Sequence, residues 1–280
     1  MLNKKEQQEF SFLLKRAFDE DRVYGDITSK FLPGASRVKV RIVARGNYYL
    51  AGAALLPGIF AARSKNIRVR MFKKDASAIS RGGIVCSVEG DAGAIFSSER
   101  VALNFLSFLS GIASKTASFR KIIDDNWDAP VRPMLMDTRK TLPGFRYLSK
   151  YAVRCGGGVN HRFDLAKVAM VKDNHIAYAG LDPLIEAFRH TKVIFEADDI
   201  KSAGRILSIK PYVLLCDNFN PRQASRAVEL RDRISPRTLI ELSGGIDEKT
   251  VLKYKHIPVD RISSGALTHS AVSADFSLEV

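Results

Sequence analysis

The second half of the chain repeats a short apolar run that is followed by a polar or glycine-rich turn and then by a helix-like stretch. Successive runs end about 20 to 35 residues apart, which suits the βα units of a parallel sheet. Continuous apolar character is typical of interior parallel strands, because both of their faces are covered. The predicted strands are residues 134–136, 168–171, 193–195, 213–215, 239–242 and 259–262.

The first hundred residues indicate a mixed α/β segment. Apolar residues between Phe10 and Phe18 recur at helical spacing in a polar stretch, which predicts an amphipathic helix. Residues 37–42 and 68–71 alternate basic and apolar side chains, the pattern of half-buried strands. Residues 99–116 are apolar almost all round the helical wheel, so we expect a helix buried between two layers.

Composition excludes several classes of protein. With 280 residues, of which 46% are hydrophobic and 26% charged, the chain resembles an average globular protein and not a disordered or collagen-like one. The longest largely apolar run, residues 48–62, is interrupted by glycine and proline, so we expect no membrane span. No secretory signal is evident at the amino terminus. The three cysteines lack metal-ligand spacing, which favours reduced thiols and a cytoplasmic location.

The chain is strongly basic, with 44 Lys and Arg against 30 Asp and Glu, a net charge of +14. Two kinds of partner fit this charge: nucleic acids, and small anions such as phosphates and carboxylates. The sequence contains no block of five or six like charges, no aromatic RNA-binding motif and no zinc-finger spacing. Composition alone therefore leaves the choice open.

Polar residues follow each predicted strand of the second half. In an α/β barrel the active site is built from the carboxyl ends of several strands. One polar residue after a strand would mean little, since loops are polar anyway, but six consecutive units make chance a poor explanation. These residues are Asp137 and Arg139, Lys172, Glu196, Asp217, Ser243 and Gly265.

Several of these positions suit the binding of anions. Arg139 offers a planar fork for a carboxylate or phosphate, and Lys140 a point charge for phosphate. Three consecutive glycines, residues 156–158, allow close backbone approach to a ligand and precede His161 and Arg162. A solvated basic turn and a flexible linker are the alternatives. Lys172 could form a Schiff base or bind an anion, and the nearby cations favour the anion.

Two carboxylates and two glycine-containing turns complete the predicted site. Glu196 and Asp217 lie on separate units and suit Mg²⁺, which takes few carboxylates together with substrate phosphates. Salt bridges to neighbouring lysines or arginines are the alternative for both. Residues 243–247 precede a helix-like segment, and their backbone N–H groups could hold a phosphate at the start of that helix. Residues 263–267 repeat this pattern on the next unit.

Taken together, these stretches resemble the quinolinate phosphoribosyltransferase family. The matches run in family order over nearly the whole chain, and their joint specificity is high although each alone is weak. They are residues 25–28 (GDIT), 99–116 (ERVALNFLSFLSGIASKT), 137–162 (DTRKTLPGFRYLSKYAVRCGGGVNHR), 171–176 (VKDNHI), 215–219 (LCDNF), 241–246 (ELSGGI) and 262–269 (ISSGALTH).

The resemblance implies an α/β fold of two domains. An amino-terminal α/β sandwich domain, residues 1–112, would be joined by the carboxyl-terminal segment 268–280. Residues 113–267 would form an irregular, seven-stranded α/β barrel with parallel strands, of which six are placed above. The family forms homodimers or higher assemblies of dimers, in which an arginine matching Arg100 reaches into the partner's site. No specific nucleic-acid or membrane partner is expected.

The implied reaction transfers phosphoribosyl from phosphoribosyl pyrophosphate to quinolinate with decarboxylation, which gives nicotinate mononucleotide, pyrophosphate and CO₂ for NAD biosynthesis. By resemblance, the catalytic residues are Lys140, Lys172, Glu196 and Asp217, with Mg²⁺ at Glu196 and Asp217. Quinolinate would be held by Arg139, His161, Arg162, Lys172 and the partner's Arg100. The 5′-phosphate would be held by Ser243, Gly244, Gly245, Gly265 and His269.

The chain departs from the family pattern at Ile194, where a second glutamate is common, and at Leu142, where threonine is usual. Three alternatives stay open. Relatives linked to molybdenum uptake share the fold, although their motifs drift at segments that are kept here. Activity on nicotinate without decarboxylation would require fewer cations around the ring. The third is a nucleic-acid surface on the unassigned basic residues Arg63, Lys65, Arg68, Arg70, Lys73 and Lys74.

Overall fold

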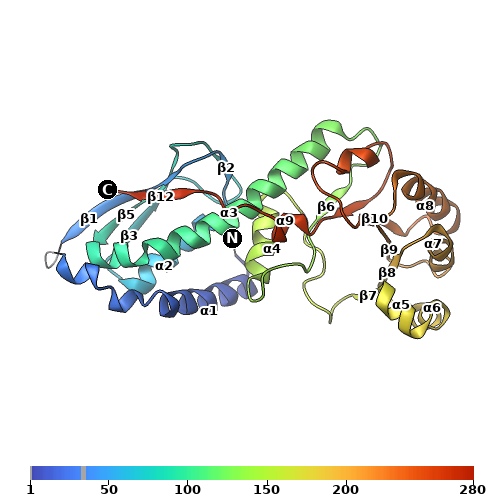
Figure 1. Cartoon of the computed structure of the whole chain (residues 1–280), viewed down its shortest axis with the longest axis horizontal. Coiled ribbons are helices and arrows are strands. Elements are labelled where there is room, and N and C mark those ends of the chain that lie inside the picture. Colours follow the sequence, from blue (N-terminus) through green and yellow to red (C-terminus); the bar gives the residue numbers. More distant parts are fainter. Residues whose placement is uncertain (1, 33–35) are drawn as a thin grey trace. The chain divides into compact units, whose positions relative to one another are not determined.

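A computed structural model describes residues 2–32 and 36–280, and the chain divides into two compact units. The first unit comprises Met1–Ala117, Thr141–Gly157 and Leu267–Val280. The second unit comprises Ser118–Lys140 and Gly158–Ala266. Figure 1 shows the elements of both, coloured along the sequence.

The first unit is built on an antiparallel sheet. In the described part of the chain this sheet has the strand order β12-β1-β5-β3, so that the carboxyl-terminal strand pairs with β1 (Figure 1). A small second sheet pairs β2 with β4. The strands are β1 (Arg37–Ala44), β2 (Tyr48–Tyr49), β3 (Arg68–Met71), β4 (Ala78–Ile79), β5 (Ile84–Asp91) and β12 (Phe276–Glu279). The predicted strands at residues 37–42 and 68–71 are confirmed as β1 and β3.

Helices accompany this sheet. The predicted amphipathic helix is confirmed as α1, and the predicted helix at residues 99–116 is the middle of the much longer α3, which continues from the first unit into the second. The helices that lie wholly or partly in the first unit are α1 (Lys4–Glu20), η1 (Val23–Gly25), η2 (Thr28–Phe31), η3 (Ala53–Leu55), α2 (Leu56–Arg63), α3 (Ala92–Asn126), α4 (Arg146–Cys155) and α9 (Ala266–His269), with η marking 3-10 helices.

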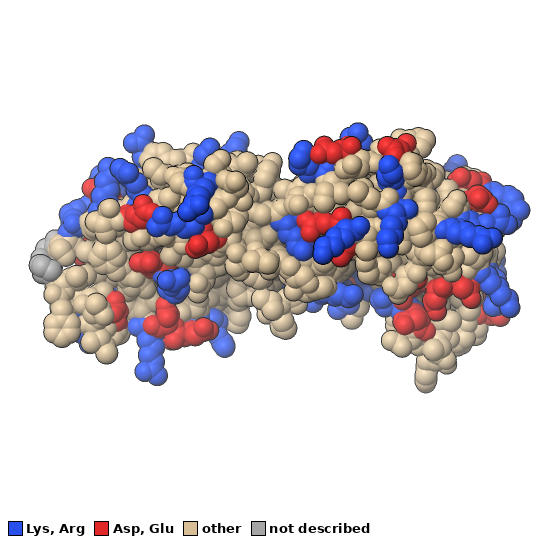
Figure 2. Space-filling model, turned by 45° about the horizontal axis from the view of Figure 1, so that its top comes forward, with Lys and Arg blue, Asp and Glu red and all other residues tan. Residues whose placement is uncertain are grey.

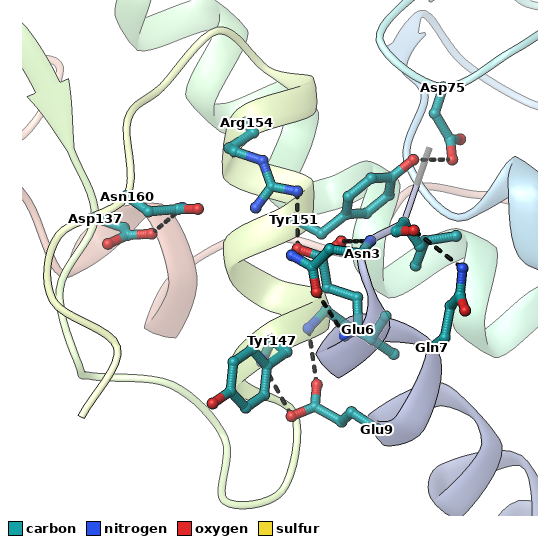
Figure 3. A network of polar contacts seen from close by, with 12 residues as sticks. Asn3, Glu6, Gln7, Glu9, Asp75, Asp137, Tyr147, Tyr151, Arg154 and Asn160 are labelled. Atoms are coloured by element: carbon teal, nitrogen blue, oxygen red, sulfur yellow. Dashed lines mark hydrogen bonds and ion pairs between the residues drawn. The ribbon is translucent and has the colours of Figure 1, made fainter. Parts of the chain in front are cut away.

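Side chains of α1 hold α4 in the first unit (Figure 3). The Glu9 carboxylate accepts hydrogen bonds from the backbone N–H groups of Tyr147 (3.0 Å) and Leu148 (2.7 Å) in the first turn of α4. These N–H groups have no partner within their own helix, so Glu9 serves as their cap. One turn earlier on α1, Glu6 lies 2.8 Å from the guanidinium of Arg154 near the end of α4. The loop that leaves α4 therefore starts from a fixed position.

The second unit is a parallel sheet flanked by helices (Figure 1). Its described strands follow the order β6-β11-β10-β9-β8-β7, and every pair in it is parallel. The strands are β6 (Met134–Met136), β7 (Ala169–Val171), β8 (Val193–Ala197), β9 (Val213–Asp217), β10 (Leu239–Ser243) and β11 (Arg261–Ser263). The helices are α5 (Asp173–Ala179), α6 (Leu181–Phe188), α7 (Ile200–Leu207), α8 (Pro221–Ile234) and η4 (Val251–Tyr254).

All six strands that the apolar runs predict are confirmed, with ends that differ by at most two residues. A further parallel contact joins Met136 of β6 to Val159 as an isolated bridge. This bridge stands beside β6, at the end of the sheet opposite β7, and the seventh strand that the resemblance implies is not among the described strands. The α/β class and the parallel sheet that the sequence predicts are thus confirmed.

One face of the parallel sheet carries an apolar cluster. Residues paired in register share a face, so Ile194, Val213 and Leu239 lie together on one face, together with Leu215. Ile194, Val213 and Leu215 form a buried apolar cluster on this face of the sheet. We call this the inner face. No helix in the described ranges is long and apolar enough to cross a membrane.

Candidate active site

Charged and polar residues gather at the carboxyl-terminal end of the inner face. Glu196 pairs in register with Leu215, and Asp217 with Ser243, so Glu196, Asp217 and Ser243 project from the same side of the sheet. The sequence analysis placed these three residues just beyond their strands. That was wrong: Glu196 lies within β8, and Asp217 and Ser243 end β9 and β10. The sheet itself therefore positions them, and they are not incidental loop residues.

Lys172, the first residue after β7, contacts this cluster directly. Its Nζ lies 2.6 Å from Oε2 of Glu196, whose side chain is only 5% exposed. Burial is the main cause that raises the pKa of Asp217, and the charge of Glu196 raises it further, while Lys172 and Lys140 oppose the shift. The salt bridge that was the alternative for Glu196 is thus present. This salt bridge places the ammonium group of Lys172 beside the carboxylate of Glu196, and it does not prevent either group from binding a ligand.

Arg139 and Arg162 form a second group, of two cations. Burial lowers the pKa of Arg162, and the nearby charge of Arg139 lowers it further. The Arg139 Nε atom is buried and has no hydrogen-bond acceptor in residues 2–32 and 36–280. Neighbouring guanidinium groups repel each other unless an anion lies between them. The pair is therefore prepared for a carboxylate or phosphate.

A buried carboxylate fixes the loop that carries Arg162. Oδ1 of Asp137 accepts the backbone N–H of His161 at 2.8 Å, and Oδ2 accepts the Asn160 side-chain amide at 2.6 Å (Figure 3). Asp137 has no exposed surface. The sequence analysis named Asp137 only as a residue after a strand and gave it no role. The position of Asp137 directly after a buried strand was the sequence signal that could have indicated a role for it.

The ring of His161 faces protein groups on both sides. Its Nδ1 accepts the backbone N–H of Arg162 at 2.8 Å, and its Nε2 lies 3.2 Å from Oε1 of the buried Glu241. In this structure both ring nitrogens face protein groups, and only 7% of the side chain is exposed. The assignment of His161 to the substrate stays a prediction.

The first glycine-containing turn, residues 243–247, lies beside the residues that follow β9. Asn218 donates its backbone N–H to the Ser243 carbonyl at 2.9 Å, and a Cβ added at Gly244 would come within 2.3 Å of the Asn218 side chain. Gly244 and Gly245 both have positive φ, +85° and +60°, which favours glycine. Around Gly245 a Cβ would meet no atom within 4 Å, so this backbone has open space above it.

The segment after this turn is not the α-helix that the sequence analysis expected. Asp247 accepts the backbone N–H groups of Lys249 and Thr250, and only the four-residue 3-10 helix η4 follows. An α-helix dipole is therefore not available at this turn, while its backbone N–H groups remain. The Ser264 hydroxyl donates to the Ile246 carbonyl at 2.7 Å, which ties the second turn, with Gly265, to the first.

The glycine run at residues 156–158 has more than one purpose. A Cβ added at Gly156 would lie 2.4 Å from the Ala113 carbonyl oxygen of α3, so this glycine allows a close approach between chain segments. Gly157 has a φ of +86° and turns the chain after α4. These two glycines serve packing and turning, and the ligand contact that the sequence analysis considered stays a prediction.

Two predicted site residues belong to the first unit. Arg100 is exposed on α3, and Nδ1 of His269 lies 2.6 Å from the Ser270 hydroxyl. Lys140 lies at the end of a segment of the second unit, where its backbone N–H donates to the Thr138 hydroxyl.

Glu196 and Asp217 could supply some, but not all, of the ligands of a magnesium ion. No group of three His, Cys, Asp or Glu side chains in the described ranges could hold a metal ion by itself. Glu196 and Asp217 supply two hard oxygen donors, and burial with the charge of Glu196 also raises the pKa of Asp198. Mg²⁺ commonly takes one or two carboxylates together with phosphate oxygens of a substrate. The donor set fits such a shared ion.

The excess basic residues do not form one continuous patch on the face shown in Figure 2, where acidic side chains lie among them. Arg63 and Arg70, two of the unassigned basic residues, lie over the rings of Tyr24 and Phe72. The expected absence of a specific nucleic-acid partner stays a prediction.

Comparison with known proteins covers nearly the whole chain. Residues 26–110 match the model of the quinolinate phosphoribosyl transferase N-terminal domain, and residues 112–279 match that of the C-terminal domain. A probable nicotinate-nucleotide pyrophosphorylase [carboxylating] of Bacillus subtilis is 35% identical over 96% of this chain and 92% of its own. Its counterpart in Archaeoglobus fulgidus is 37% identical over 92% and 98%.

Solved structures agree with these matches. The nicotinate-nucleotide pyrophosphorylase from Francisella tularensis superimposes with a TM-score of 0.88 at 30% identity, covering 100% of this chain and 98% of that one. Human nicotinic acid phosphoribosyltransferase, at 13% identity and a TM-score of 0.60 over 95% and 73% of the two chains, shares the fold alone. The motifs, the sheet and both domain models lead to one conclusion: the chain belongs to the quinolinate phosphoribosyltransferase family.

Proposed function

We propose that the chain transfers the phosphoribosyl group of phosphoribosyl pyrophosphate to the nitrogen of quinolinate, with decarboxylation, in NAD biosynthesis. The products are nicotinate mononucleotide, pyrophosphate and CO₂. Family membership supports the reaction class. The observation that carries the substrate is the pair of half-buried guanidinium groups, Arg139 and Arg162, with the buried Nε of Arg139 lacking an acceptor in the described part of the chain.

Quinolinate carries two adjacent carboxylates, and the proposed site meets them with cations. Arg139 and Arg162 each present a planar fork that can take a carboxylate through two hydrogen bonds. Lys172 supplies a further positive charge after exchanging its contact with Glu196 for one with the substrate. Fixing both carboxylates also aims the ring nitrogen at the anomeric carbon of the ribose, so that positioning supplies much of the rate enhancement.

The transfer step forms a carbon–nitrogen bond and breaks the bond from the anomeric carbon to pyrophosphate, whose oxygen leaves with the electron pair. Lys140 stabilises the negative charge that develops on the leaving group. Glu196 and Asp217 accept hydrogen bonds from the ribose hydroxyls, and their charge favours the positive character of the reacting ribose. The backbone at Ser243, Gly244, Gly245 and Gly265, together with His269, binds the 5′-phosphate.

Decarboxylation needs no separate electron acceptor. Once the ring nitrogen is quaternary, the bond to the adjacent carboxylate breaks, CO₂ leaves, and its electron pair stays on the ring carbon beside the positive nitrogen. A proton then takes the place of the lost carboxylate. Arg139 and Arg162 hold the remaining carboxylate, which keeps the ring in place during this step.

Glu196 and Asp217 are the residues proposed to hold Mg²⁺. When bound with the pyrophosphate group, the ion supplies positive charge that neutralises the phosphate oxygens. The two carboxylates share this ion with the substrate, because the described side chains offer no third ligand close by.

The active assembly is proposed to be a homodimer, or a higher assembly of dimers, in which the partner's Arg100 completes the quinolinate site. Mixing the inactive variants Arg100→Ala and Lys140→Ala tests this directly. If Arg100 acts across the interface, half of the randomly reassorted dimers carry one intact site, so about a quarter of wild-type activity returns. No recovery after subunit exchange would place Arg100 in its own subunit's site.

The same proposal includes a cytoplasmic location, which the three unpaired, buried cysteines fit.

Direct binding tests the assignment of the substrate. We expect titration calorimetry to show that quinolinate binds wild-type protein at least about tenfold more tightly than nicotinate does, because the second carboxylate adds charge-assisted hydrogen bonds. Arg139→Lys keeps the charge but loses the fork, and should weaken quinolinate about tenfold or more while nicotinate changes less. Equal affinity for both ligands would favour the nicotinate-specific alternative.

A further inference from the structure

Glu241 is a buried carboxylate that no predicted role accounts for. It lies in the middle of β10, between apolar neighbours, and its side chain has no exposed surface. The register pairs it with Leu215 on one side and Arg261 on the other, so it occupies the inner face in the same row as Glu196. Burying a carboxylate at such a position costs free energy unless nearby cations or hydrogen-bond donors compensate its charge.

Two cationic or proton-donating groups face this carboxylate. Nε2 of His161 lies 3.2 Å from Oε1, and Nη1 of Arg261 lies 3.9 Å from Oε2. Neither oxygen of Glu241 makes a well-aligned hydrogen bond within the described ranges. Arg261 is itself held in place, because its Nη2 donates to the Tyr212 hydroxyl at 2.8 Å and its guanidinium lies over that ring. The charge of Glu241 is thus balanced by Arg261 and directed at His161.

The tautomer of His161 follows from its other nitrogen. Nδ1 accepts the backbone N–H of Arg162, so it carries a lone pair and no proton. The ring proton is then on Nε2, the nitrogen that faces Glu241. A carboxylate stabilises this tautomer and fixes the plane of the ring, as acidic partners of histidine commonly do.

We propose that Glu241 is a positioning residue for the quinolinate site, acting through His161 on the main chain of Arg162. The linkage has two steps: Oε1 of Glu241 lies 3.2 Å from Nε2 of His161, and Nδ1 of His161 accepts the backbone N–H of Arg162. The guanidinium of Arg162 is anchored separately, by Nη1 donating to the Val168 carbonyl at 3.0 Å. His161 is thereby given a role in orienting Arg162. This inference rests on the proposed function for the identity of the ligand.

A double-mutant cycle tests the linkage. Glu241→Gln keeps the shape but removes the charge, and we expect it to raise KM for quinolinate about tenfold, with KM for phosphoribosyl pyrophosphate changed less than about twofold. His161→Asn should keep an acceptor for the Arg162 N–H while losing the contact with Glu241. In that background Glu241→Gln should add less than about twofold, because residues that act in series are not additive. Glu229→Gln, an exposed carboxylate on α8, is the matched control and should change nothing.

Additive effects of the two substitutions would overturn the proposal, since His161 would then act on quinolinate independently of Glu241. Equal losses for both substrates would also overturn it, because they indicate a general effect on the fold. Thermal unfolding of each variant, followed by the fluorescence of Trp127, separates these cases from misfolding.

A spectroscopic measurement tests the inference without turnover. In protein labelled with ¹⁵N-histidine, the signals absent from His161→Asn belong to His161. We expect the pattern of a neutral ring protonated at Nε2 in the wild type, and a shifted or exchange-broadened pattern in Glu241→Gln. A proton on Nδ1 in the wild type would refute the linkage even if the enzyme is active. An inactive wild-type protein with the expected tautomer would instead refute the proposed function alone.

Discussion

Replacement of Asp137 by alanine tests the account of the loop that carries Arg162. The substitution removes the acceptor of two short hydrogen bonds, from the His161 N–H and the Asn160 amide, inside a site with no exposed carboxylate surface. A buried donor left without a partner costs about 1–3 kcal/mol. Because Asn160 is partly exposed and can reach water, we expect a total loss of about 2–4 kcal/mol in the free energy of unfolding.

Urea denaturation provides the assay. The only tryptophan of the chain, Trp127, is buried in the second unit, so its fluorescence reports on the unit that carries Asp137. With a denaturant slope of about 3 kcal/mol per molar, the midpoint should fall by about 1 M. Displacement of the loop should also lower kcat/KM for quinolinate about a hundredfold, since small errors in positioning are costly.

Two variants control this experiment. Asp137→Asn keeps one acceptor oxygen and should lose roughly half as much stability. Asp125→Ala, at an exposed carboxylate of the same unit, should leave the midpoint and kcat/KM unchanged. An Asp137→Ala protein with the midpoint and activity of the wild type would refute the reasoning, because the loop would then be held by other contacts.

Two further predictions follow from the glycine turn and the thiols. Gly244→Ala forces a Cβ against Asn218 at a φ of +85°, so it should raise KM for phosphoribosyl pyrophosphate and lower the free energy of unfolding by about 1–2 kcal/mol. Gly245→Ala should have a smaller effect in the same kinetic and urea assays, because its Cβ would meet no atom within 4 Å. Equal effects of the two substitutions would contradict this prediction. Burial raises the pKa of Cys86 to about 12 and that of Cys155 to about 11, so a thiol reagent at pH 8 should label the unfolded chain only. Unfolded thiols ionise near pH 8.5, so stability measured in urea should fall as pH rises from there toward 12, and a flat profile would contradict the burial.

The sequence predicts the strands of the second unit well because both faces of that sheet are largely apolar. It misplaces Glu196 and Asp217 by assigning polar residues to loops, whereas the register puts both inside strands on the inner face. The α-helix expected after Gly245 is replaced by the short 3-10 helix η4, although Asp247 accepts the backbone N–H groups of Lys249 and Thr250 as a helix N-cap does.

The surroundings of His161 could not be predicted from local pattern. Glu241, which faces its ring, is far away in the sequence, and only the folded sheet brings the two together. Ile194 is a different case, because the family pattern marks it as a departure and the structure gives a reason. Its side chain is 2% exposed and packs with Val213 and Leu215 on the inner face, so this chain fills with apolar atoms the position where a second glutamate is common.

The most direct test of the central claim is turnover with defined substrates. Purified protein is incubated with phosphoribosyl pyrophosphate, Mg²⁺ and quinolinate labelled in the carboxylate beside the nitrogen, and in parallel with nicotinate. We predict equal amounts of CO₂ and nicotinate mononucleotide from quinolinate, no product from nicotinate, and loss of product in Arg139→Ala. Product from nicotinate, or no product from quinolinate with folded protein and intact substrates, would contradict the assignment of the decarboxylating transferase.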